Sequence, residues 1–414
     1  MPSKLIYLPI EAYQSRSTEY MSVKGGVYES CFQEAGIDFE AIRPWSTVNE
    51  IQQGIVVDYV TRSRWGFKQV LQLLESLSQS QLDPEEHVIF IEDFWTPGFE
   101  MIPYAQSLKY GYDVSKHVPV YSFCHAQSTD PYDFTARMSY WMRSMEKGWA
   151  DYQSGIVCAS KEMIQQWLRG GLPSSKLNLC GLSFNAKAMR RMFNVPEVVP
   201  TKRAPQVVFS SRWDSEKNPD YFLAVAEHYA TYRPEVEFIV CTGLDNLTSN
   251  DPDLLTRLAE YCRRFKNLNV WTALSKQQYF AILRGAKVQF NCASQDFVSY
   301  TLLDAMLNGC APLYPDILTF PDALNNSDKN LYHSHNSFKS TSHISIKDCV
   351  KKLDALLDAE WEDYSWIYKK YESSTRRKLC AMGFNQFAGV PTLSWLNSLT
   401  VEALKACQSE HESA

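Results

Sequence analysis

Short apolar runs alternate with helical patterns along most of this 414-residue chain. In the first half, such runs occur at Lys4–Ile10, His87–Ile91, Pro119–Phe123 and Gly155–Cys158. Continuous apolar strands that are separated by helices are typical of a parallel sheet whose two faces are both covered. The alternation therefore predicts an α/β fold.

A proline-rich, aperiodic segment at Asn194–Pro205 interrupts this alternation. Beyond it the pattern restarts, with apolar runs such as Glu237–Cys241 and helical segments such as Pro252–Arg264. A chain of this length also exceeds one ordinary core, since domains usually contain about 50–200 residues. We therefore expect two α/β domains, at residues 1–196 and 206–384, with one cleft between the carboxyl ends of their strands.

Composition restricts the compartment and the type of partner. Apolar residues make up 45% and charged residues 21% of the chain, which is ordinary for a globular protein. No apolar run approaches twenty residues and the N-terminus lacks a signal-peptide pattern, so we expect no transmembrane segment. The eleven irregularly spaced cysteines are typical of reduced thiols, and we expect a cytoplasmic protein. A net charge of −6 argues against non-specific coating of nucleic acid but allows a local basic groove.

Two cations lie five residues apart in a polar loop that follows the apolar run at 206–211. These residues, Arg212 and Lys217, can converge on one point beyond the end of the predicted strand. A pyrophosphate group suits such a pair, because Arg binds phosphate as a fork and Lys as a point charge. Taken alone, two loop cations are also typical of a solvated surface.

Two carboxylates, Asp296 and Asp304, flank a predicted strand-to-helix turn about eighty residues further on. The residues between them include Ser299, Tyr300 and Thr301, whose backbone N–H groups lie at a helix N-terminus and can hold an anion. Carboxylates accept hydrogen bonds from sugar hydroxyls, so this arrangement suits a sugar diphosphate. Either Asp alone could equally be a helix cap or a surface acid. Its conjunction with the earlier cation pair is what favours a nucleotide-sugar site.

This conjunction resembles the nucleotide-binding domain of the retaining GT-B glycosyltransferases. That group carries a strand ending in Arg, a Lys five residues later, and then a Glu-x7-Glu motif across a loop and a helix. The resemblance implies that Arg212 and Lys217 bind the donor diphosphate and stabilise it as it leaves. It further implies that Asp296 faces the donor sugar and Asp304 the donor ribose. Both acids are Asp, one methylene shorter than Glu, and the glycines usual after the first acid are absent.

The same resemblance implies the GT-B fold, in which two Rossmann-like domains face each other across a cleft. A C-terminal helix then crosses back, and we expect the tail at 385–414 to pack on the first domain in this way. For the nucleotide base, the two strand ends at Gly243 and Leu274 are the predicted contacts, because both follow strands of the second domain.

Polar side chains also follow strands of the first domain. His125 lies just past a predicted strand end and is expected to act at the catalytic centre through a polar contact with the donor sugar or the acceptor. Glu11, Glu92, Asp93 and Gln127 are the predicted acceptor-side residues. A lone His is also common in a structural role, and an acid after a strand is often a turn or cap residue.

Four further motifs are Ile10-Glu11-Ala12-Tyr13, Phe123-Cys124-His125-Ala126-Gln127, Arg212-Trp213-x3-Lys217-x-Pro219-x2-Phe222 and Asn308-Gly309-Cys310-Ala311-Pro312-Leu313-Tyr314-Pro315. Together they resemble the tRNA-queuosine mannosyltransferase branch of this group. The Gly-Gly-Ser-His loop of that branch is replaced here by residues 14–18. The layout also resembles phage enzymes that glycosylate hydroxymethylated DNA bases. Both likenesses imply a modified nucleobase in tRNA or DNA as acceptor.

Three basic clusters could contact nucleic acid or be solvated helix faces: Lys187-Arg190-Arg191, Arg263-Arg264-Lys266 and Arg376-Arg377-Lys378.

The resemblance thus implies a retaining glycosyltransferase that uses a UDP- or GDP-sugar, and we expect no bound metal or other tightly bound cofactor. Dinucleotide-binding and Walker motifs are absent from the sequence. The closely spaced pair His333 and His335, with His343 further along the chain, has no third metal ligand at a suitable spacing. The Asp251-Pro-Asp253 segment is expected to cap a helix. Two alternatives stay open: transfer to a lipid or cell-surface saccharide, and a non-catalytic protein that only binds nucleotide sugars.

Overall fold

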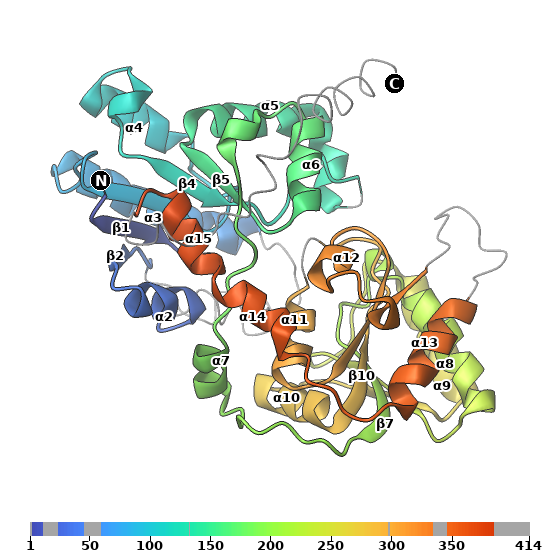
Figure 1. Cartoon of the computed structure of the whole chain (residues 1–414). Helices are drawn as coiled ribbons and strands as arrows, with labels where there is room; N and C mark the ends of the chain where they lie inside the picture. Colours follow the sequence, from blue (N-terminus) through green and yellow to red (C-terminus); the bar gives the residue numbers. More distant parts are fainter. Residues whose placement is uncertain are drawn as a thin grey trace. The chain divides into compact units, whose positions relative to one another are not determined.

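The computed structural model describes residues 2–10, 24–44, 59–131, 133–296, 299–333 and 346–384. The chain divides into two compact units (Figure 1), unit 1 from Met1–Asn185 with Tyr371–Ala414, and unit 2 from Ala186–Lys370. The division therefore falls before the segment at 194–205 that the sequence marks as a linker. This segment joins unit 2 because Arg203 donates hydrogen bonds to the carbonyl oxygens of Leu283 and Ala286 at 2.9 and 2.8 Å.

Unit 1 contains a parallel sheet in the order β2-β1-β3-β4-β5-β6. Its first strand lies between β2 and β3, so the strand order reverses at β1, and in sheets of this kind ligands bind outside the carboxyl ends of the strands at that point. The strands β3 and β5 are buried throughout, as expected for a sheet covered on both faces. The bounds are β1 Lys4–Leu8, β2 Asp38–Ala41, β3 His87–Ile91, β4 Val120–Phe123, β5 Gly155–Cys158 and β6 Leu177–Leu179.

Helices cover this sheet, and its core includes Leu73, Ile89 and Phe99. The 3-10 turn η3 leads directly into α5, whose α-helical part starts at Ser139. The bounds are α2 Val27–Glu34, α3 Tyr59–Ser78, α4 Met101–Tyr110, η2 Val114–Lys116, η3 Phe134–Met138, α5 Ser139–Tyr152, α6 Lys161–Arg169, η4 Ser174–Lys176 and α15 Ser374–Ala381.

Unit 2 contains a second parallel sheet, in the order β12-β11-β10-β7-β8-β9. Its first strand, β7, lies between β10 and β8, so the carboxyl ends of β7 and β10 form the point where ligands bind in sheets of this kind. The bounds are β7 Ala204–Phe209, β8 Glu237–Cys241, β9 Leu268–Trp271, β10 Ala286–Phe290, β11 Ala311–Pro315 and β12 Leu331–Tyr332.

Helices α9 and α10 of unit 2 each begin at a residue whose side chain caps the helix. Asp251 accepts a hydrogen bond from the backbone N–H of Asp253 at 3.0 Å, which confirms its prediction as a cap. The bounds are α7 Ala186–Phe193, η5 Ser215–Lys217, α8 Pro219–Tyr232, α9 Pro252–Arg264, α10 Lys276–Gly285, α11 Tyr300–Leu307, α12 Phe320–Ala323, η6 Asp328–Asn330, α13 Lys347–Asp358 and α14 Ser365–Glu372.

After α14 the chain returns to unit 1, where α15 packs against α2 (Figure 1). Lys378 of α15 is buried and donates to the hydroxyl oxygens of Tyr28 and Ser183 at 2.8 and 2.7 Å. Arg377 donates to the carbonyl oxygen of Cys180 at 2.9 Å. The return to the first unit therefore occurs at α15, ahead of the expected tail at 385–414, which lies outside the described residues.

Candidate active site

The loop between β7 and α8 is held in place by a buried indole. Trp213 is fully buried, and its Nε1–H donates to the carbonyl oxygen of Leu254 at 3.2 Å. Its ring contacts Phe209 and Phe222 edge-on. The loop ends at Asn218, which adopts a left-handed conformation (φ 53°), and Pro219 then begins α8. The neighbours of Trp213 in the sequence, Arg212 among them, are therefore presented from a rigid loop.

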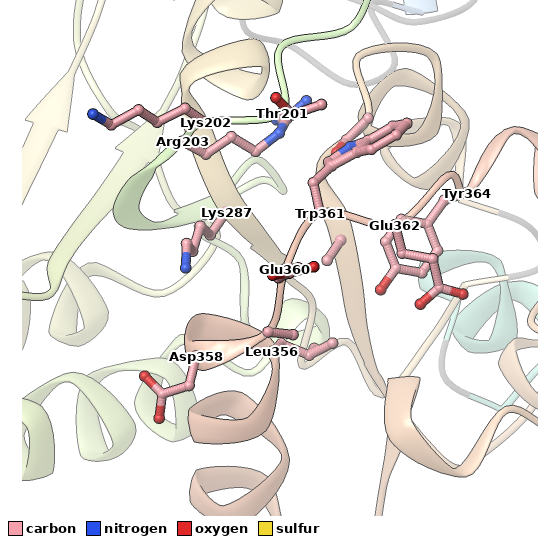
Figure 2. A pocket seen from close by; sticks show the side chains of 13 residues that line it. Thr201, Lys202, Arg203, Lys287, Leu356, Asp358, Glu360, Trp361, Glu362 and Tyr364 are labelled. Atoms are coloured by element: carbon pink, nitrogen blue, oxygen red, sulfur yellow. The ribbon is translucent and has the colours of Figure 1, made fainter.

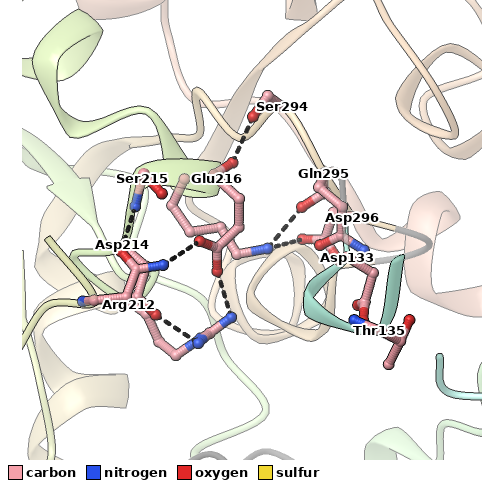
Figure 3. A network of polar contacts seen from close by, with 11 residues as sticks. Asp133, Thr135, Arg212, Asp214, Ser215, Glu216, Ser294, Gln295 and Asp296 are labelled. Carbon is pink, nitrogen blue, oxygen red and sulfur yellow. Dashed lines mark hydrogen bonds and ion pairs between the residues drawn. The ribbon is translucent and has the colours of Figure 1, made fainter. Parts of the chain in front are cut away.

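Arg212 lies on the outer side of this loop, between two carboxylates (Figure 3). Its guanidinium nitrogens lie 2.5 Å from Asp214 Oδ2 and 2.5 Å from Glu216 Oε1. Asp214 is itself fixed, because its Oδ1 accepts a hydrogen bond from the backbone N–H of Asn250 at 2.8 Å. The Arg212 side chain remains 48% exposed, so a bound anion could still reach it.

Lys217 connects this loop to the one that follows β10. Its Nζ donates to the carbonyl oxygen of Gln295 at 2.7 Å and lies 4.0 Å from Asp296 Oδ2, and the side chain is only 11% exposed. The backbone N–H and the hydroxyl of Ser294 both donate to the carbonyl oxygen of Glu216 at 2.8 Å (Figure 3). The structure therefore brings Lys217 and Asp296 together at the carboxyl ends of β7 and β10.

Helix α11 begins beside these residues. Ser299 is its N-cap residue, and the carbonyl oxygen of Ser299 accepts from the N–H groups of Leu302 and Leu303. The Ser299 hydroxyl lies 2.6 Å from the hydroxyl of Thr301, while Tyr300 is the first helical residue. The N-terminus of α11, with its partial positive charge, thus lies next in the chain to the loop that carries Asp296.

The second acid, Asp304, is fully buried on α11. Its Oδ2 accepts a hydrogen bond from Lys276 Nζ at 2.8 Å. Lys276 is the first residue of α10, and its Nζ lies 5.0 Å from the ring centre of Tyr279. Burial, and secondarily the charge of Asp304, raises the pKa of the Tyr279 hydroxyl. Sequence reasoning missed Lys276, although its place directly after the cap Ser275 at a strand-end loop could have indicated it.

The two loops predicted to contact the base lie side by side. The N–H of Leu274 donates to the carbonyl oxygen of Thr242 at 3.2 Å, and that of Ala273 donates to Leu244 at 2.7 Å. A Cβ on Gly243 would lie 3.3 Å from the carbonyl oxygen of Leu274. Ala273 has a positive φ of 54°, which is uncommon for a residue other than glycine and is found at functional sites.

In unit 1, Glu92 and Asp93 follow β3 but are both buried and paired. Glu92 accepts hydrogen bonds from the Tyr7 hydroxyl and from the backbone N–H of Ile10. Asp93 forms an ion pair with Arg62. These contacts hold the ends of β1 and β3 together, and any direct contact of the two acids with an acceptor stays a prediction. Glu11 lies outside the described residues.

His125 and Gln127 follow β4. The ring of His125 packs edge-on against Phe123, with the ring centres 4.6 Å apart. Gln127 is fully buried, and its amide donates to Gln166 Oε1 at 2.7 Å and to the carbonyl oxygen of Met163 at 3.3 Å. These contacts of Gln127 hold the loop to α6. The expected roles of His125 and Gln127 toward donor or acceptor also stay predictions.

Sequence reasoning missed the buried Glu146 of α5, which holds the same loop. Its carboxylate accepts from the N–H and the hydroxyl of Ser128 at 2.8 and 2.5 Å, and from Trp95 Nε1 at 3.1 Å. Burial raises the pKa of this carboxyl group. Only the helical position of Glu146, on the face that also carries Met142 and Ala150, could have indicated its burial.

Several members of the basic clusters are engaged within the protein. Arg190 donates to the carbonyl oxygens of Pro196 and Leu307, at 2.5 and 3.1 Å. Arg264 pairs with Glu227 at 3.2 Å. Lys378 is buried in unit 1, together with most of Arg377, so a solvated helix face is the wrong interpretation of these two residues. They dock α15 instead.

A pocket of about 320 Å³ lies at the opposite edge of the unit 2 sheet, where β7, β10 and β11 begin. In Figure 2, Lys202, Arg203 and Lys287 lie on one side, and Trp361 and Tyr364 lie on the other. Its polar groups serve the fold: Arg203 donates to four backbone carbonyl oxygens, and Lys287 donates to the carbonyl oxygen of Leu357. None of the predicted site residues lines this pocket.

The described residues bear on two further expectations. None of the helices in these ranges is long and apolar enough to cross a membrane. The ten cysteines within them are free thiols, seven of them buried. Burial raises the pKa of thiols such as Cys310 to about 12, so they are inert as nucleophiles near neutral pH.

No protein-family model matches this chain. Solved structures do resemble it over nearly its whole length. The galactosyltransferase WaaB of the lipopolysaccharide outer core has a TM-score of 0.58 at 14% identity, over 92% of this chain and 99% of its own. Sucrose-phosphate synthase from Thermosynechococcus elongatus has a TM-score of 0.55 at 12% identity, over 93% and 96%.

Anabaena HepE, in complex with UDP and glucose, has a TM-score of 0.51 at 11% identity, over 97% of this chain and 99% of its own. These three proteins share a fold of two Rossmann-like domains with this chain, which contains two six-stranded parallel sheets with helices. Identities this low establish architecture. The chain therefore has the GT-B fold.

Proposed function

We propose that this protein is a glycosyltransferase that transfers a sugar from a nucleotide-sugar donor to a hydroxyl group. One observation carries the proposal: the β7–α8 loop with Arg212 and Lys217 meets Asp296 and the N-terminus of α11 at the point where the strand order reverses. Cations, helix amides and a carboxylate at one place suit a sugar diphosphate, because the first two bind phosphate and the third accepts sugar hydroxyls.

The reaction we propose breaks the bond between the anomeric carbon and the phosphate oxygen of the donor. A new bond forms between that carbon and the acceptor oxygen, and the acceptor proton passes to the departing diphosphate. Arg212 and Lys217 stabilise the negative charge that develops on the diphosphate. Attack occurs on the face that the diphosphate leaves, so the configuration is retained, and these cations perform the charge stabilisation without a metal.

The donor we propose is a UDP- or GDP-sugar. HepE, which shares the fold, contains UDP in two structures, and this supports UDP as the first donor to test. The adjacent loops at Gly243 and Leu274 present backbone groups for the base. Asp296 would orient a hydroxyl group of the sugar.

The acceptor we propose is a modified nucleobase in tRNA or DNA. Its support is the set of motifs around His125 and Gln127 that this chain shares with enzymes acting on such bases. A second candidate is a lipid-linked acceptor, and a specific observation favours it. Tyr104 and Leu108 lie on the outer face of α4 with 59% and 63% of their surface exposed, which is typical of a face that meets an apolar partner.

Mass spectrometry of nucleosides tests both parts of the proposal. The protein is incubated with UDP- and GDP-sugars and with tRNA containing queuosine, DNA containing hydroxymethylated pyrimidines, or lipid vesicles. A sugar mass added to one nucleoside would support the nucleobase acceptor. Release of nucleoside diphosphate with transfer only in the presence of vesicles would favour the lipid acceptor. If no nucleoside diphosphate is released from any donor, the proposed enzymatic activity is contradicted, and a protein that only binds nucleotide sugars is favoured.

A further inference from the structure

A buried ion pair joins the two sides of the candidate donor site. On one side, Leu274 and Thr242 belong to the loops expected to contact the base. On the other, α11 begins beside Asp296, where the phosphates are expected. Lys276 of α10 reaches across to Asp304 of α11, with 2.8 Å between Nζ and Oδ2. The ammonium group offsets part of the cost of burying the Asp304 carboxylate.

The two partners differ in their access to a ligand. The Asp304 side chain has no exposed surface, whereas a quarter of the Lys276 side chain is exposed. A molecule bound in the site therefore meets Lys276 rather than Asp304. The backbone of Lys276 is fixed, because Ser275 and Gln278 form a capping box at the first turn of α10. Its Nζ also lies over the rings of Tyr279 and Phe280, at 5.0 and 5.1 Å from their centres.

The place of Lys276 in the site identifies the part of the ligand that it meets. In any nucleotide the ribose lies between the base and the phosphates. Lys276 lies two residues after Leu274, whose loop is hydrogen-bonded to the loop of Gly243, and its partner Asp304 lies one turn into α11. An ammonium group is a hydrogen-bond donor and so matches a ribose hydroxyl oxygen.

We propose that Lys276 binds a ribose hydroxyl of the nucleotide donor, and that Asp304 is the positioning residue that holds its ammonium group. The proposal rests on the proposed function. It reassigns the ribose contact, which the family resemblance places on Asp304, to Lys276, which sequence reasoning missed. The physical reason is that Asp304 is buried and already bonded.

Calorimetric binding of UDP, 2′-deoxy-UDP and 3′-deoxy-UDP, and of the matching GDP series, tests this assignment. For the wild type, we expect removal of one of the two hydroxyls to raise Kd about 10- to 100-fold, the range for a hydrogen bond to a charged group. The variant Lys276→Met should bind the ribonucleotide about 10- to 100-fold more weakly than the wild type does, and its Kd values for the ribonucleotide and the deoxy form should be equal. Lys276→Arg, which keeps a cation, should retain part of the discrimination.

Two further variants keep the outcome interpretable. Lys276→Met removes the cation beside the buried Asp304 carboxylate, so the double variant Lys276→Met/Asp304→Asn removes both charges and should show the same loss of discrimination. Arg212→Ala should weaken all the nucleotides equally and preserve their ratio. If Lys276→Met raises the Kd of every nucleotide by the same factor, the ammonium group contacts the phosphates and the proposal is overturned. Unchanged Kd values for Lys276→Met would also overturn it. Failure of the wild type to bind any nucleotide would instead contradict the proposed function.

Discussion

At the scale of single residues, each cation of the candidate site lies near one or two carboxylates of the same chain. Arg212 lies between Asp214 and Glu216, and Lys217 lies near Asp296. Such pairs in a partly exposed site contribute little to stability, but they fix where each charge points. The spacing of Arg212 and Lys217 was visible in the sequence. Their acidic partners were not, because nothing in a loop sequence indicates which neighbours turn toward a guanidinium group.

Replacing Arg212 should affect turnover far more than stability. We expect Arg212→Ala to lower kcat/KM for donor hydrolysis or transfer about 10²- to 10³-fold, because one group that stabilises the leaving diphosphate is lost. Its stability should change by less than about 1 kcal/mol, since the Arg212 side chain is half-exposed and solvent screens its charge. The control is Arg257→Ala. Arg257 is an exposed residue of α9, and its Nε lies 2.8 Å from Asp220 Oδ1. Full activity of Arg212→Ala would contradict the assignment.

At the scale of elements, α11 is fixed at both ends. Its N-terminus lies at the candidate site, and its C-terminus is followed by Gly309, which has a φ of 71°. Arg203 donates to the carbonyl oxygen of Asn308 at 2.7 Å, and Trp361 donates to that of Gly309 at 3.1 Å. A glycine directly after a helical segment is a local signal for the end of a helix. The two side chains that close the helix end come from other segments and could not be found locally.

Gly309→Ala should therefore destabilise unit 2 strongly. The new Cβ would lie 2.2 Å from Val199 Cγ1 and 2.7 Å from Arg203 Nη2, in addition to the strain of a left-handed residue. Gly36→Ala is the matched control, because Gly36 also follows a helix with a φ of 66° but has no atom within 4 Å of an added Cβ. We expect a loss of about 1–2 kcal/mol for the control from strain alone and a further 1–3 kcal/mol for Gly309→Ala. Equal losses in urea unfolding would refute the predicted clash.

At the scale of the whole molecule, α15 returns to unit 1 by means of a buried cation. Lys378 is enclosed by Tyr28, Ser183 and Phe123, with its Nζ 4.2 Å from the ring centre of Phe123. Burial lowers the pKa of Lys378 to about 7, although Cys180 and Glu92 favour the charged form. Docking of α15 thus depends on how many protons this residue carries.

Stability should rise with pH because of this residue. Lys378 has a pKa near 7 in the folded chain and near 10.5 in the unfolded chain, so between these values the unfolded chain binds more protons. The free energy of unfolding of the wild type relative to Lys378→Met should therefore increase from pH 7 to 8.5, by at most about 1.4 kcal/mol per pH unit. Below pH 7 the difference should be constant. Urea unfolding at a series of pH values measures it, and a difference that is flat up to pH 8.5 would exclude a depressed pKa.

The sequence by itself determined the elements and the fold class. Strand β8 and helix α9 lie at the residues predicted for them, because an apolar run and an Asp-Pro cap are local signals. Two α/β units and the loops that carry Arg212 and Asp296 follow from the same signals. Tertiary structure alone decided which side chains meet, as in the pair of Lys276 and Asp304. Burial, which removes a charge from water and obliges it to find a partner, depends on contacts between segments distant in the chain. Periodicity within one segment does not record such contacts.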